Sequence, residues 1–221
     1  MSDAGLARFI DHWTIEFVRT YPHPIERVWN AIADPHEIGV WFIQPTIWEP
    51  RTGGAYRFHN DEFAGRVEVA EPPRFIRFRF RDDAPADAWP GADAYFQFEL
   101  EPTPGGTRLT YLQHAAPGVV DPDEPDPDFV SPGRPGALAG WHAAFEELGF
   151  RLDGVRLRDR RMAPTRLSEI ARDWAASGVS DAFTHDQKRL ILIGLRARER
   201  HRDYTDLYRE HVRATRPARE A

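Results

Sequence analysis

The sequence has no cysteine among its 221 residues. This absence excludes disulfide bonds, thiolate zinc sites and cysteine nucleophiles. Long hydrophobic runs are missing as well, since no stretch approaches the roughly 20 apolar residues that a membrane-spanning helix needs. The N-terminal stretch, MSDAGLARFIDHW, also lacks the basic start and apolar run of a secretory signal. We therefore expect a cytoplasmic protein with no membrane span.

Several catalytic and nucleotide-binding motifs are missing too. The sequence contains no Gly-x-Ser-x-Gly elbow, no phosphate-binding loop and no dinucleotide fingerprint. Its two glycine pairs, Gly53-Gly54 and Gly105-Gly106, fall where turns between strands are expected and do not have the spacing of a phosphate cradle. No cofactor is therefore expected.

Charge is distributed unevenly along the chain. From residue 151 onward there are 17 Lys+Arg against 11 Asp+Glu, a net charge of +6, whereas residues 1–150 carry −12. Such an asymmetry suggests two structural units. Because acidic residues are scattered through the basic segment, a solvated helical surface is favoured over a nucleic-acid-binding face, and we expect no nucleic-acid partner.

The first part of the chain predicts one strand followed by two short helices. Thr14–Tyr21 is rich in β-branched and aromatic residues, which is typical of a strand. Pro24 suits the first position of a helix, where its missing N–H costs nothing. Asp34 can cap a second helix that ends near Trp41, and Glu37 can complete a capping box.

The hydrophobic period then changes to two, which predicts a sheet. The alternation of arginines with Ile76, Phe78 and Phe80 predicts a strand with one buried face and one solvent-exposed face. Hairpin connections make the sheet antiparallel. The predicted strands after the two helices are Ala55–His59, Phe63–Glu71, Arg74–Arg81, Tyr95–Glu101 and Thr107–His114.

A long helix follows the strands. Its apolar stripe at spacings of three and four consists of Leu138, Trp141, Phe145, Leu148 and Leu152. A sheet that is apolar on one face must bury that face, and this helix is the natural cover. The expected fold class is α+β, with a curved antiparallel sheet of about six to seven strands packed on a long helix, in the helix-grip arrangement.

Several short motifs, taken together, resemble a known family. They are Arg19–Trp29, Asp34-Pro35, Trp41, Gly53-Gly54, Gly65-Arg66-Val67, Glu71-Pro72-Pro73 and Gly140-Trp141. Their order and spacing are similar to those of the SRPBCC (START-like) superfamily, in the branch of activator of heat-shock-protein-90 ATPase homologues, over about residues 12–155. The resemblance implies a START-like domain at 1–155. Residues 156–221, whose pattern is helical, lie outside the usual domain, and we expect them to form a helical C-terminal extension.

The resemblance also implies a function. Many relatives bind lipids, polyketides or other apolar small molecules in a cavity between the sheet and the long helix. We therefore expect an apolar or amphipathic small molecule as the ligand. Two alternatives remain open: a cyclase- or hydratase-type enzyme acting on a bound carbonyl compound in the same cavity, and a co-chaperone-like protein-interaction module.

The candidate ligand-binding residues are the aromatic and polar side chains expected to face inward. The polar pair is Gln113, which shares a face with Leu109 and Tyr111, and Arg19, which follows Ile15 and Phe17. Either could orient a ligand carbonyl or carboxylate, since a buried polar group needs a partner. The alternative interpretation is a core filled by its own side chains. The full set is Arg19, Trp41, Phe58, Phe78, Phe96, Phe98, Tyr111, Gln113, Trp141 and Phe145.

An acid–base or metal set can be drawn from His59, Asp61, Glu62 and His114. In the enzyme alternative, His59, Tyr111 or His114 would act on the bound carbonyl compound. The ligand spacings typical of metal sites are missing, so no metal is expected.

The C-terminal extension carries a last long helix. Thr184 opens it with a capping box, and it runs to about Arg213. Its apolar side consists of Leu190, Ile193, Tyr204, Leu207 and His211. This side can pack on the preceding domain, or it can pair with a second copy of the chain in a homodimer.

Overall fold

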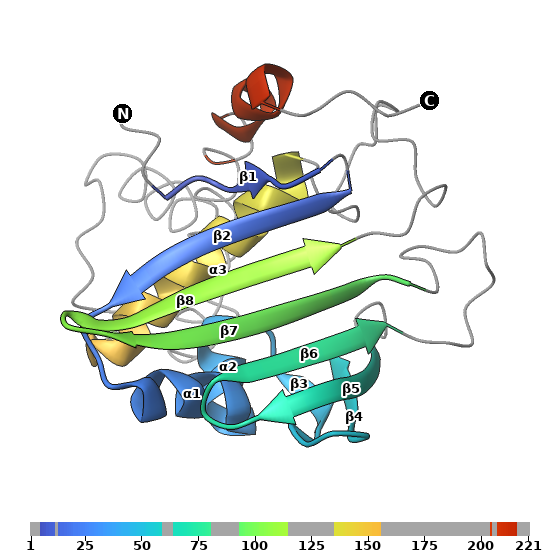
Figure 1. Ribbon diagram of the computed structural model, residues 1–221, viewed down its shortest axis with the longest axis vertical. Coiled ribbons are helices and arrows are strands. Elements are labelled where there is room, and N and C mark those ends of the chain that lie inside the picture. Colours follow the sequence, from blue (N-terminus) through green and yellow to red (C-terminus); the bar gives the residue numbers. More distant parts are fainter. Residues whose placement is uncertain are drawn as a thin grey trace, which may run out of the picture.

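The computed structural model describes residues 5–11, 13–58, 64–80, 93–114, 135–155, 204 and 207–215. In these ranges the chain forms one eight-stranded sheet, three helices that precede residue 155, and a helical stretch at 207–215 (Figure 1). The strands are β1 (Arg8–Phe9), β2 (Thr14–Tyr21), β3 (Pro45–Trp48), β4 (Ala55–Phe58), β5 (Ala64–Glu71), β6 (Phe75–Phe80), β7 (Tyr95–Thr103) and β8 (Gly106–His114). The helices are α1 (Ile25–Ala33), α2 (Pro35–Trp41) and α3 (Pro135–Leu152).

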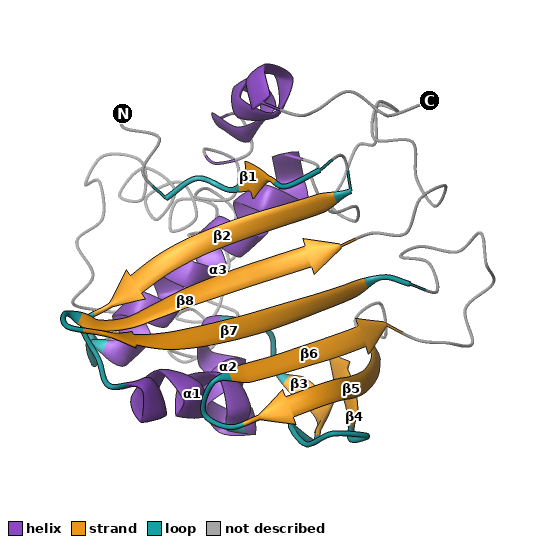
Figure 2. Ribbon diagram, viewed as in Figure 1, coloured by secondary structure: helices purple, strands orange, loops and turns teal. Residues whose placement is uncertain are grey.

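The sheet is antiparallel throughout and strongly curved. Its strand order is β1-β2-β8-β7-β6-β5-β4-β3 (Figure 2). Tyr56 on β4 contacts Phe96 on β7 with their ring centroids 5.7 Å apart, although β5 and β6 lie between these strands. A flat sheet would separate them by about three strand spacings of ~4.8 Å. The concave face therefore closes around its own aromatic side chains.

The long helix covers the concave face, as predicted. Figure 1 shows α3 running diagonally behind the strands, with α1 and α2 at one end of the sheet. The five stripe residues from Leu138 to Leu152 are all buried. Together with the alternation of Ile76, Phe78 and Phe80, all buried on β6, this arrangement confirms the expected helix-grip fold.

The two short helices also form where predicted, with two differences at their starts. Pro24 occupies the N-cap of α1 instead of its first turn. The side chain of Asp34 caps α2 by accepting from the backbone N–H groups of His36 and Glu37, at 2.8 and 3.1 Å. The predicted capping box is wrong, because the Glu37 carboxylate pairs with Arg151 on α3 instead. This ion pair lowers the pKa of Glu37 and ties α2 to α3.

The sheet contains more strands than the six to seven expected. The two additions are β1 and β3, which form its opposite edges. Neither has the length or the clear alternation that identified the other strands. The hairpin between β7 and β8 has a steric reason for glycine, because a Cβ at Gly106 would lie 2.1 Å from the backbone oxygen of Tyr21.

Part of the predicted extension packs against the sheet and α3. Tyr208 is fully buried within the main hydrophobic cluster. Its hydroxyl accepts from the backbone N–H of Ala7 at 3.0 Å, and His211 Nε2 lies 2.6 Å from the Ala7 carbonyl oxygen. Leu190 and Ile193 lie outside the described residues, and a homodimer through these helices stays a prediction.

None of the helices in the described ranges is long and apolar enough to cross a membrane.

Candidate functional site

The ten predicted ligand-binding residues lie on one side of the sheet or on the helices that cover it. Nine of them are buried, and Arg19 is half-buried. The strands contribute Arg19 from β2, Phe58 from β4, Phe78 from β6, Phe96 and Phe98 from β7, and Tyr111 and Gln113 from β8. The helices contribute Trp41 from α2 and Trp141 and Phe145 from α3. Because strand side chains alternate between faces, each of these strand residues shares the concave face with its i±2 neighbours.

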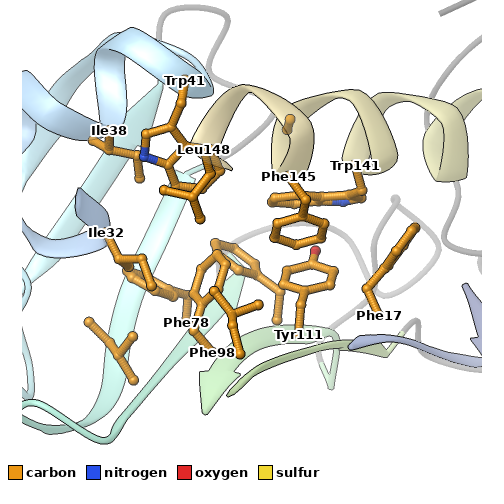
Figure 3. Close-up of a cluster of buried hydrophobic side chains, with 14 of the residues drawn as sticks. Phe17, Ile32, Ile38, Trp41, Phe78, Phe98, Tyr111, Trp141, Phe145 and Leu148 are labelled. Atoms are coloured by element: carbon orange, nitrogen blue, oxygen red, sulfur yellow. The ribbon is translucent and has the colours of Figure 1, made fainter. Parts of the chain in front are cut away.

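Seven of the eight aromatic members form one continuous network of ring contacts, and Phe58 joins it through Tyr56. We call this set the aromatic cluster. Figure 3 shows Trp141 and Phe145 pointing from α3 towards the sheet, with Tyr111 rising to meet them. The centroids of Tyr111 and Trp141 are 4.2 Å apart, and Phe78 stacks on Phe96 at 4.7 Å. Neither Trp141 nor Phe145 points at water, since their exposed fractions are 4% and 1%.

Three members of the site join through hydrogen bonds at its centre. The side-chain oxygen of Gln113 accepts from the Tyr111 hydroxyl and from the Trp141 indole N–H, each at 2.9 Å. Gln113 itself is 2% exposed. Burial, reinforced by the neighbouring phenol of Tyr56, raises the pKa of Tyr111 well above its usual value. Tyr111 is therefore a neutral hydrogen-bond donor at physiological pH.

Tyr56 is the polar residue that the sequence analysis missed. It lies on β4, is 2% exposed, and contacts Phe78 and Phe96 edge-to-face. Among the described residues, no atom forms a hydrogen bond with its hydroxyl. Burial raises the pKa of this phenol, so it too is neutral. Its position two residues before Phe58 in a predicted strand was a signal that it faces inward.

Two other aromatic residues complete the cluster and were also missed. Phe42, directly after α2, lies almost parallel to Trp141, with ring centroids 4.6 Å apart and an angle of 9°. Trp48 on β3 stacks on Phe78 at 5.1 Å and donates its indole N–H to the backbone oxygen of Ala33. Trp48 ends a strand that the sequence did not reveal, and Phe42 follows the last residue of a helix, so neither had a periodic pattern to mark it.

Arg19 lies at the margin of the aromatic cluster. Its guanidinium carbon is 5.3 Å from the ring centroid of Phe17 and 5.7 Å from that of Phe145, within the range of cation–π attraction. Burial is the main cause of a lowered pKa for Arg19. One terminal nitrogen donates to the carbonyl oxygen of Val18 at 3.0 Å, whereas the other is buried without a hydrogen-bond partner among the described residues.

The helical stretch at 207–215 closes the end of the site near Arg19. The Tyr208 hydroxyl lies 3.0 Å from His142 Nδ1 on α3. The same hydroxyl accepts from Ala7 N–H, so Tyr208 links α3 to the N-terminal segment through two hydrogen bonds. Burial, with the charge of Arg19 adding, lowers the pKa of His142 from 6.5 to about 4.

Only one residue of the proposed acid–base or metal set, His114, lies among the described residues. His59, Asp61 and Glu62 lie outside the described residues. His114 follows Gln113 on β8 and so projects from the opposite, convex face, where it binds the Thr14 hydroxyl at 2.8 Å and stacks on Tyr95. Within the described ranges, no group of three His, Asp or Glu side chains could hold a metal ion.

The central polar atoms can bind but do not readily ionise. Two neutral phenols, one amide and one indole N–H are set among aromatic rings, where low polarity strengthens each hydrogen bond. Such a set can orient a carbonyl or hydroxyl group on a flat apolar molecule. A phenol with a raised pKa is a poor general acid and a poor nucleophile at neutral pH.

Comparison with known proteins agrees with this architecture. Residues 22–153 match the family described as "Activator of Hsp90 ATPase homolog 1-like protein". A search of curated proteins found no significant match. Among solved structures, the solution structure of CalU16 from Micromonospora echinospora is similar over 95% of this chain and 99% of its own, with 19% identity and a TM-score of 0.51. Protein MLL2253 from Mesorhizobium loti is 27% identical over 65% of this chain and 99% of its own, with a TM-score of 0.47.

Proposed function

The chain belongs to the family of activator of Hsp90 ATPase homolog 1-like proteins, within the SRPBCC superfamily, and we propose that it binds an apolar or amphipathic small molecule between the sheet and α3. The ligand is lipid- or polyketide-like in its chemistry. The ten predicted residues, joined by Tyr56, Phe42 and Trp48, form its site.

The buried hydroxyl of Tyr56 carries this proposal. Native proteins almost always give a buried hydroxyl a hydrogen-bond partner, because leaving one unpaired costs about 1–3 kcal/mol. Tyr56 has no such partner among the described residues, although tyrosine and phenylalanine fill nearly the same volume. A ligand carbonyl or hydroxyl group would satisfy this phenol, and that explains why the position holds tyrosine.

The ligand has to displace aromatic rings that now touch one another. Phe42 is the natural one to move, because it is half-buried, follows the end of α2, and lies flat on Trp141. A planar ligand ring in its place would keep the stacking on Trp141. We therefore place the entry at Phe42 and expect flat, polycyclic or extended apolar ligands to bind best.

An enzyme of the cyclase or hydratase kind is the second candidate. A neutral phenol aimed at a carbonyl oxygen can stabilise negative charge that develops there during a reaction. Tyr56 has the buried hydroxyl that this role needs, and no described residue forms a hydrogen bond with it. Binding is favoured because the polar groups at the centre of the aromatic cluster, Tyr56, Tyr111, Gln113 and Trp141, include no general base.

Native mass spectrometry tests the proposal. The protein as purified, and after incubation with methyl 2-naphthoate, polycyclic ketones and long-chain fatty acids, should carry one ligand per chain. Tyr56→Phe should weaken binding of the neutral carbonyl probes by about tenfold, the equivalent of one buried hydrogen bond. Adduct-free protein with every probe would contradict binding. A probe that is chemically altered by the wild type and not by Tyr56→Phe would establish the enzyme instead.

A further inference from the structure

The guanidinium of Arg19 is a half-buried positive charge that the described residues do not fully pair. β2 places Arg19 on the same face as Phe17 and Tyr21, and its guanidinium lies over the rings of Phe17 and of Phe145 on α3. The Tyr21 hydroxyl is used elsewhere, donating to the backbone oxygen of Phe145 at 2.9 Å. One Arg19 nitrogen has a single backbone acceptor and the other has none among the described residues.

The nearby acidic side chain, Glu146, has a different hydrogen-bond partner. Glu146 on α3 lies close enough to influence Arg19 electrostatically, but its carboxylate accepts a hydrogen bond from the Tyr204 hydroxyl. No ion pair forms between Arg19 and Glu146 in the described structure. The faces of Phe17 and Phe145 offer cation–π attraction, which offsets only part of the cost of removing a guanidinium from water.

We propose that Arg19 binds a carboxylate on the ligand, so that the chain selects apolar acids over neutral molecules of the same shape. This inference rests on the proposed function and names the ligand class of the same site. The unpartnered nitrogen presents N–H donors in the planar geometry that suits a carboxylate oxygen. Phe17 and Phe145 link Arg19 to Tyr111, with centroid distances of 6.3 and 5.4 Å, so the apolar body of the ligand can extend from Arg19 into the aromatic cluster.

The surroundings favour a single negative charge. A carboxylate neutralises one guanidinium, whereas a dianionic phosphate would leave an uncompensated charge in an apolar setting beside Glu146. Tyr208, fully buried, closes this end of the site and limits water there. The ligand therefore lies with its acid group towards the helical stretch at 207–215 and its carbonyl or hydroxyl group towards Tyr56.

A matched pair of probes tests the inference. Isothermal titration calorimetry at pH 7 compares 2-naphthoic acid with methyl 2-naphthoate, which has the same rings and no charge. The wild type should bind the acid at least about tenfold more tightly than the ester, the equivalent of one charge-assisted hydrogen bond. Arg19→Met should abolish this preference, and Arg19→Lys should retain part of it.

The outcomes separate this inference from the proposed function. Arg108→Met is the control, because Arg108 is on the convex face of β8 and pairs with Glu101, and it should change neither affinity. If the ester binds the wild type as tightly as the acid does, the carboxylate assignment is overturned while ligand binding stands. An acid preference that survives in Arg19→Met also overturns it. Failure of both compounds to bind the wild type would remove the proposed function and this inference together. If Arg19→Met does not fold, the inference is tested by the ratio of acid to ester affinity in the wild type and by the change of that ratio in Arg19→Lys.

Discussion

The indole N–H of Trp141 on α3 donates a hydrogen bond to the side-chain oxygen of Gln113 on β8, at 2.9 Å. Tyr111 donates to the same oxygen from the sheet side. Apolar packing between a helix and a sheet has no strong directional preference, whereas this bond fixes where α3 lies over β8. Gln113 is thus the point at which the two layers of the fold meet with a defined geometry.

Replacement of Gln113 should show how much its two hydrogen bonds, from Tyr111 and Trp141, stabilise the fold. Gln113→Met keeps the volume but leaves the Tyr111 hydroxyl and the Trp141 N–H without their acceptor. We expect the free energy of unfolding to fall by about 2–4 kcal/mol, since each buried unpaired donor costs about 1–3 kcal/mol. Urea unfolding of the wild type and the variant measures this loss. The control is Gln97→Met on the convex face of β7, where, among the described residues, Gln97 accepts from the half-buried Arg77. Equal losses in the two variants would contradict a special role for Gln113.

The two phenols of the site should respond in opposite directions to the same change. Tyr56→Phe removes a hydroxyl that has no hydrogen-bond partner in the described part of the chain, so the ligand-free protein should gain about 1 kcal/mol of stability or stay unchanged. Tyr111→Phe removes a donor to Gln113 and should cost about 1 kcal/mol. Chemical unfolding of ligand-free protein measures both. A clear loss of stability in Tyr56→Phe would show that its hydroxyl already has a partner, and the proposed ligand contact would lose its basis.

The buried imidazole of His142 makes stability depend on pH. Its pKa is lowered from 6.5 to about 4, so the unfolded chain binds a proton in this window and the folded chain does not. Stability from this group is therefore present above about pH 6.5 and is lost as the pH falls towards 4. Allowing for partial exposure, we expect the wild type to lose on the order of 1–2 kcal/mol more than His142→Gln between pH 7 and pH 4.5. Chemical unfolding curves at pH 7 and pH 4.5 give the free energy of unfolding of both proteins. Equal losses in the wild type and in His142→Gln would contradict a role for His142 in this pH dependence. The charged or titratable neighbours of His142 are Arg19, Tyr204 and Tyr208.

The division of the chain at residue 155 remains a prediction that truncation tests. We expect a fragment of residues 1–155 to fold, because it contains the whole sheet and α3. It should be less stable than the full chain by roughly 2–5 kcal/mol, since it loses the buried ring of Tyr208. Tyr208→Ala in the full chain should reproduce most of that loss. An insoluble fragment would show that residues 156–221 are integral to the fold.

The sequence predicted the parts of the fold that repeat a pattern. In the alternation over Arg74–Arg81 and in the stripe from Leu138 to Leu152, several apolar residues recur on one face of the element. The sequence therefore predicted which face of each element is buried. The edge strands β1 and β3 have few such residues, and they pair only because a neighbouring strand is present. Glu37 has the spacing of a capping box, yet Arg151, 114 positions away, binds its carboxylate more favourably.

The burial of the candidate site residues was predictable from the sequence, whereas their hydrogen bonds were not. The inward faces of β7 and β8 identified Phe96, Phe98, Tyr111 and Gln113 in advance. The unpartnered hydroxyl of Tyr56 depends instead on what a curved sheet brings near it across two intervening strands, which no local pattern encodes. The same is true of Phe42, whose stacking on Trp141 follows from how α2 lies against α3.

The location of a bound neutral probe tests the account most directly. In a nuclear Overhauser experiment on the full chain saturated with methyl 2-naphthoate, the naphthalene protons should show contacts to the ring protons of Tyr56, Tyr111 and Trp141. Contacts confined to exposed apolar side chains such as Val40 and Ile47, with none to those three rings, would contradict a ligand site between the sheet and α3.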